Sequence, residues 1–126
     1  MSFSSGAENI KKDILRISST RCKDLFNKIV DDTPFDTGYA SGNWQTSSSE
    51  SSSTVDRRGK DAAKSEIESV ITNDYFLKNK VVYFFNNVDY AYGLEYGNPS
   101  YTSPAAPFSM QAPNGMVRVN IKNFTI

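Results

Sequence analysis

The stretch TPFDTGYASGNW (Thr33–Trp44) decides how the chain is organised, because it stands between a long helical pattern and a first alternating pattern. Pro34 ends the helix, since the residue before a proline is disfavoured in the α region. Asp36 and Thr37 can hydrogen-bond nearby backbone amides, and Gly38 accepts the positive φ of a tight turn. The stretch therefore predicts a turn where a helix gives way to a sheet.

The segment before this turn, Ala7–Asp32, predicts an amphipathic helix, with lysines and arginines interleaved with acids on its polar side. Its apolar residues recur at helical spacing: Ile10, Ile14, Ile17, Leu25 and Ile29, broadened by Leu15, Cys22, Phe26 and Val30.

The segments after the turn predict a mixture of strands and helices. Tyr39–Gln45 alternates like a strand. The serine-rich residues 46–55 predict a mobile loop or hairpin tip, because nothing in them offsets the entropy of ordering. Asp56–Asn73 returns to helical spacing, and the β-branched and aromatic run Lys80–Val88 predicts a buried strand.

The last third of the chain is richer in aromatic residues and prolines. Asp89 can cap a short helix over Tyr90–Tyr96. Residues 98–113 carry four of the five prolines and predict an irregular loop. Gly115–Phe124 fits a helix or a strand, and we favour the helix. Together these segments predict one α+β domain over residues 1–126, with a long N-terminal helix and a second helix packed on a small, mainly antiparallel sheet.

The amino-acid composition argues against several classes of function. Basic and acidic residues number 14 each, so no overall field attracts nucleic acid or an anionic membrane. Histidine is absent and Cys22 stands alone, which leaves no expected metal site, cofactor site or histidine-based catalysis. With no apolar run of membrane-spanning length and no signal-peptide core, we expect synthesis in the cytoplasm and no contact with a membrane.

Phe35-Asp36-Thr37-Gly38 is also the sequence found around the catalytic residue of aspartic proteases, and a dimer of short subunits could supply two such aspartates. That fold places the aspartate after a hydrophobic strand, whereas here it follows a long helix and Thr33-Pro34. We therefore favour the turn and keep the dimeric protease as an alternative. A DNA-binding accessory factor is a further alternative, which salt-dependent binding would identify.

Three blocks of the sequence, TPFDTGYASGNW, NNVDYAYGLEYG (86–97) and QAPNGMVRVNIKNF (111–124), resemble in order and spacing the small neck and tail-completion proteins of long-tailed bacteriophages. The resemblance implies a virion structural protein that forms a homo-oligomeric ring, a hexamer or dodecamer. The ring would join the capsid connector to the tail, next to the tail terminator and tail tube proteins, with DNA only as passing cargo. The tail terminator ring is the alternative within this class. The implied turn motif is Pro34, Asp36, Thr37, Gly38, Asn43 and Trp44.

Tyrosines crowd the second block, and tyrosine is enriched at protein–protein contacts. We expect residues 94–97 and the proline-rich loop over residues 98–113 to form one side of a head-to-tail subunit contact, whose partner patch is the first helix or the strand around Trp44. The candidate interface residues are Tyr92, Leu94, Glu95, Tyr96, Gly97, Pro113, Met116 and Arg118. The alternative interpretation is that Trp44 and Leu94 are core residues and Glu95 is merely solvated.

Overall fold

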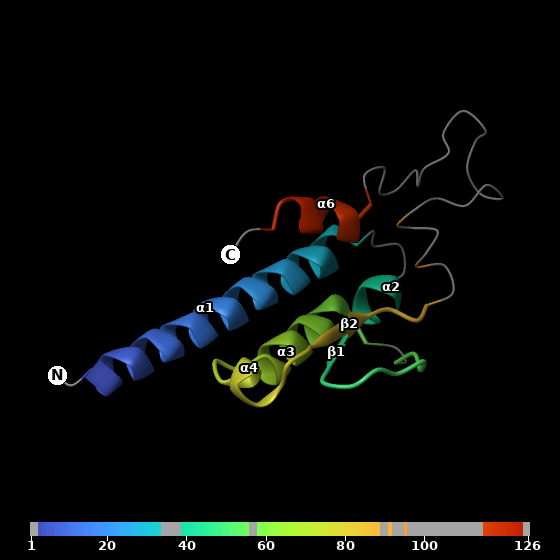
Figure 1. Ribbon diagram of the computed structural model, residues 1–126. Coiled ribbons are helices and arrows are strands. Elements are labelled where there is room, and N and C mark those ends of the chain that lie inside the picture. Colours follow the sequence, from blue (N-terminus) through green and yellow to red (C-terminus); the bar gives the residue numbers. More distant parts are fainter. Residues whose placement is uncertain are drawn as a thin grey trace.

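The computed structural model describes residues 3–33, 39–55, 58–88, 91, 95 and 115–124 (Figure 1). The long helix is confirmed as α1, Phe3–Asp32. Its C-terminal half packs against the other elements, and its N-terminal half extends beyond them (Figure 1). The other helices and strands whose bounds lie within the described residues are α2 (Tyr39–Gly42), β1 (Gln45–Ser47), α3 (Lys60–Val70), α4 (Tyr75–Lys78), β2 (Tyr83–Phe85) and α6 (Val117–Lys122).

A stack of three aromatic rings joins α1 to the sheet. The Phe84 ring lies between two others, with its centroid 4.1 Å from that of Phe26 and 4.6 Å from that of Trp44, and both pairs are nearly parallel. Trp44 Nε1 also donates to Thr33 Oγ1 over 2.7 Å, at the end of α1. The rest of the buried core is mainly aliphatic, with one further aromatic ring and one methionine: Ile29, Val30, Ala63, Ile67, Ile71, Tyr75 and Met116.

The sheet consists of two antiparallel strands that are distant in sequence. Gln45 pairs with Phe85, Thr46 with Phe84 and Ser47 with Tyr83. Helices α3 and α4 lie between the two strands in the chain, so the serine-rich segment after β1 is not a hairpin tip. The fold is α+β, as expected.

The predicted strand Tyr39–Gln45 is wrong over most of its length. Residues Tyr39–Gly42 form α2, and the Asn43 amide closes a turn onto Ala40 O at 3.2 Å. Five consecutive residues, Ala40, Ser41, Gly42, Asn43 and Trp44, are all buried. An alternating strand would bury every second residue. The alternation of small residues in this stretch was therefore not evidence of a strand.

Other predicted elements are present but shorter than expected. The helix predicted from Asp56 begins only at Lys60, after Gly59, and the strand predicted over Lys80–Val88 is reduced to β2. Helix α6 confirms the helical interpretation of Gly115–Phe124. Of the helix predicted over Tyr90–Tyr96, only Ala91 and Glu95 lie within the described residues, and both are helical.

The apolar stripe of α1 does not all face the core. Phe26, Ile29 and Val30 are buried. Three isoleucines of the same stripe are exposed in the first half of the helix: Ile10 at 63%, Ile14 at 58% and Ile17 at 40%. Periodicity identified the stripe correctly, but only its second half has other described elements packed on it. Within the described ranges, none of the helices has the length and hydropathy that a membrane span requires.

Candidate functional site

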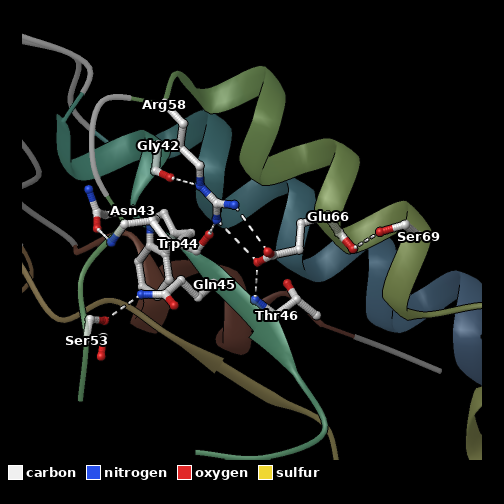
Figure 2. Close-up of polar contacts among 10 residues, drawn as sticks. Gly42, Asn43, Trp44, Gln45, Thr46, Ser53, Arg58, Glu66 and Ser69 are labelled. Atoms are coloured by element: carbon white, nitrogen blue, oxygen red, sulfur yellow. Dashed lines mark hydrogen bonds and ion pairs between the residues drawn. The ribbon is translucent and has the colours of Figure 1, made fainter. Parts of the chain in front are cut away.

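An arginine and a glutamate hold the outer edge of β1, and we call this group the β1-edge cluster: Gly42, Trp44, Thr46, Arg58 and Glu66 (Figure 2). Arg58 Nε donates to Gly42 O over 2.7 Å, and Nη2 donates to Trp44 O over 2.6 Å. The guanidinium also bonds both carboxylate oxygens of Glu66, at 3.1 and 3.2 Å. Glu66 Oε1 in turn accepts the Thr46 amide at 2.8 Å.

This cluster blocks one edge of the sheet. The Thr46 amide and the Trp44 carbonyl point away from β2, since Glu66 and Arg58 bind them on the other side. An exposed row of such groups is a template for pairing with another chain. Helix α3, which carries Glu66, lies along this edge and covers it.

Three amide side chains tie the serine-rich segment to the sheet. Asn43 Oδ1 accepts the Val55 amide at 2.8 Å. Gln45 Nε2 donates to Ser53 O at 2.8 Å, and Asn87 Nδ2 donates to both Ser51 O and Ser53 O at 2.8 and 2.9 Å. Asn43 therefore has a structural role in holding this loop, and the predicted mobility of the loop stays a prediction.

A second carboxylate–arginine group, the Glu95 cluster, joins the second and third sequence blocks. The Glu95 carboxylate accepts the amides of Met116, Val117 and Arg118 at 2.7, 2.9 and 2.9 Å. Arg118 Nε also donates to Glu95 Oε1 at 3.0 Å, and Arg118 Nη2 donates to Glu95 O. Glu95 thus caps the start of α6, whose first amides have no acceptor within the helix.

The electrostatics of Glu95 follow from this environment. Its side chain is 7% exposed. Burial alone raises the pKa of Glu95, but the hydrogen bonds from the Val117, Arg118 and Met116 amides and from the Arg118 side chain outweigh it, so the pKa lies below its ordinary value. The carboxylate is therefore ionised at neutral pH and neutralised locally by donors of the same subunit.

Each cluster has a glycine where a side chain would not fit. Gly115 has φ of +76°, and a Cβ there would lie 2.5 Å from Glu95 Oε1. A Cβ at Gly42 would overlap the carbonyl of Arg58. The glycine of the third block is thus explained by the close approach of Glu95 and by the left-handed backbone.

A buried amide fixes α6 on α1. Asn120 is 3% exposed, and its Nδ2 donates to Asp32 Oδ2 at 2.8 Å and to Met116 O at 2.6 Å. The end of α1 and helix α6 are therefore one packed unit, together with the Glu95 cluster.

The structure describes only part of the residues singled out from sequence. Trp44 and Asn43 are buried, as are Glu95 and Met116, while the Arg118 side chain is 48% exposed. The prediction that this face meets a neighbouring copy stays a prediction, and among the described residues Arg118 is the member that solvent reaches. The other predicted residues lie outside the described ranges: Pro34, Asp36, Thr37, Gly38, Tyr92, Leu94, Tyr96, Gly97 and Pro113.

Sequence reasoning missed Arg58 and Glu66. Both lie within the predicted helix Asp56–Asn73, and nothing in its helical spacing distinguishes them. Their role depends on α3 lying beside β1, which no local pattern encodes. The closest indication of their position in the sequence is Gly42, two residues before Trp44, where a side chain would overlap the carbonyl of Arg58.

Other reactive groups in the described residues are isolated. Burial raises the pKa of the Cys22 thiol to about 11, so it is an unreactive thiol at neutral pH. Among the described residues, no three Cys, Asp or Glu side chains gather as a metal site would require. Comparison with known proteins finds no family model, no curated protein and no solved structure that matches the chain.

Proposed function

We propose that this chain is a structural protein of a bacteriophage head–tail junction, a subunit of a homo-oligomeric ring between the capsid connector and the tail. It would reside in the virion neck after assembly in the host cytoplasm. The observation that carries the proposal is the Glu95 cluster. It brings together two motif blocks through bonds from one carboxylate to three consecutive amides, which lie 21, 22 and 23 residues further along the chain.

The other described motif residues support the same proposal. Trp44 stacks on Phe84 and bonds the end of α1, and Asn43 holds the loop after β1. Residues that hold distant segments of the chain in place are needed by a protein that functions through the shape of its surface. A ring subunit also needs surface for its neighbours, and the exposed isoleucines of α1 supply apolar surface on the helix expected as the partner patch.

The test is mass measurement of the purified protein alone and after incubation with isolated capsids or isolated tails. We expect a ring on the capsid connector. A ring found on tails instead would favour the tail terminator, and failure to bind either particle would overturn the proposal.

A substitution probes the expected subunit contact. Tyr96→Ala is expected to abolish ring assembly while leaving the melting temperature of the free protein unchanged. Equal loss of assembly and thermal stability would assign Tyr96 to the core.

The dimeric aspartic protease remains the alternative from another class, since Asp36 lies outside the described residues. Asp36→Asn separates the two functions, because it would abolish proteolysis by such an enzyme but would alter only the stability of a turn in a ring protein.

A further inference from the structure

The two edges of the sheet differ in their hydrogen bonding. Thr46 sends its amide away from β2, to Glu66, so the Thr46–Phe84 pair is of the kind that exchanges no hydrogen bonds across the ladder. The main-chain N–H and C=O of Phe84 therefore also point outward, on the far side of β2. Val82 and Asn86 have the same orientation, since main-chain direction repeats every second residue.

Among the described residues, the outer edge of β2 has no counterpart of the β1-edge cluster. In the described part of the chain, no side chain or loop amide is bonded to the outward main-chain groups of Phe84 or Val82. Within the described residues, the sheet thus has one edge closed by Arg58 and Glu66 and one open edge. With a single open edge, pairing cannot propagate into a fibre and closes after one partner.

The open edge is complementary to itself. We propose that the β2 edges of two copies of this chain pair antiparallel, with a two-fold axis at Phe84, to make one four-stranded sheet. In that register Phe84 pairs with Phe84 of the second copy through two hydrogen bonds, and Val82 lies opposite Asn86 on either side.

The side chains on the face of β2 opposite Phe84 favour a second copy as the occupant. Tyr83 and Phe85 are each half-buried. Their partners on β1 are Ser47 and Gln45, which offer no aromatic surface. In the two-fold register Tyr83 lies opposite Phe85 of the second copy, and aromatic cross-strand pairs of this kind stabilise antiparallel sheets.

Charge is complementary at the two ends of the strand. Lys80 is exposed just before β2. At the other end, Asn87 binds Ser51 O, next to the exposed Glu50. Antiparallel pairing brings the lysine end of one copy toward the Glu50 loop of the other. The inference does not rest on the proposed function, because it concerns the free protein and a contact different from the expected ring contact.

The first experiment is sedimentation of the purified full chain over a range of concentrations, in the absence of phage particles. We expect a dimer that dissociates on dilution. A wild-type protein that stays monomeric at the highest concentration overturns the proposal.

Charge substitutions test the register. Tyr83→Lys with Phe85→Lys, and Tyr83→Glu with Phe85→Glu, each place like charges opposite one another and should give monomers. An equimolar mixture should give a heterodimer, because every cross-strand pair is then oppositely charged. Mixed variants that stay monomeric, or single variants that still dimerise, contradict the register.

Val82→Pro keeps the proposal testable if those variants fold poorly. It removes an outward N–H that takes no part in the ladder with β1, and proline is tolerated on such an edge. We expect a monomer with unchanged fluorescence of Trp44, the chain's only tryptophan. Ile14→Lys, on the exposed stripe of α1, is the matched control and should leave the dimer intact. A dimer that survives Val82→Pro but not Ile14→Lys would assign the contact to α1 instead.

Discussion

The β1-edge cluster and the Glu95 cluster use the same chemistry at different depths. In each, a glutamate accepts main-chain amides and pairs with an arginine that also bonds a main-chain carbonyl. Glu66 is 31% exposed and Glu95 only 7%. Glu66 accepts one main-chain amide and Glu95 three, so we expect the Glu95 cluster to contribute more to stability. A buried carboxylate is retained where many donors surround it.

Removing each carboxylate is the strongest test of this difference. Glu95→Ala leaves three α6 amides without an acceptor and removes the carboxylate that pairs with Arg118 Nε, and we expect it to lower the free energy of unfolding by about 3–5 kcal/mol. Glu66→Ala leaves one amide without an acceptor and a partly solvated arginine without its carboxylate. We expect it to lower the free energy of unfolding by about 1–2 kcal/mol. Urea unfolding followed by Trp44 fluorescence measures both. Equal losses would show that burial does not separate the clusters.

Removing the arginine of the β1-edge cluster should have a smaller effect than removing Glu95. Arg58→Ala frees the carbonyls of Gly42 and Trp44, with an expected loss of about 2 kcal/mol. Arg58→Lys keeps the charge but not the planar fork, so it should recover part of that stability. Full recovery by lysine would mean that charge alone closes this edge.

Acid pH should weaken the Glu95 cluster selectively. The folded-state pKa of Glu95 lies below its ordinary value. The stability it contributes is therefore complete above the unfolded pKa, about 4.3, and is lost as pH falls through the folded pKa. Comparing melting temperatures of the wild type and Glu95→Gln from pH 7 down to pH 3 isolates the effect. The difference between them should narrow with acidification, and a constant difference would contradict the assignment.

The smallest effect is expected where a charge pair bonds no main-chain group. Lys64 Nζ lies 3.0 and 3.1 Å from the two carboxylate oxygens of Asp31, and both side chains are partly exposed. Lys64→Ala should change the free energy of unfolding by about 0.5 kcal/mol or less, and added salt should abolish that change. A loss as large as that of Glu66→Ala would show that amide acceptance is not what distinguishes the two clusters.

The sequence predicted what depends on local pattern. The spacing of Phe26, Ile29 and Val30 gave α1 and its buried end, and the class of fold followed from the alternation of helical and strand-like segments. It failed at Tyr39–Gly42, where small residues fit a strand and a helical turn equally well. It also failed for Glu66 and Glu95, because their partners are set by how distant segments pack.

Periodicity likewise cannot say what covers an apolar stripe. Ile10, Ile14 and Ile17 continue the spacing of the buried residues, yet they are exposed because no other described element packs on this half of α1. The same limit applies to β2, whose sequence predicts a strand but not which of its edges pairs with β1.

Helix α1 is 30 residues long, which corresponds to about 45 Å. Isolated helical turns are marginal in water, so the amide protons of the turns around Ile10 should exchange through local fraying. Those near Val30 should exchange only when the whole domain opens. The protection of main-chain amides from hydrogen exchange therefore rises steeply along this one helix. A protein that covered its first turns would extend the cooperatively unfolding part of the domain toward the N-terminus.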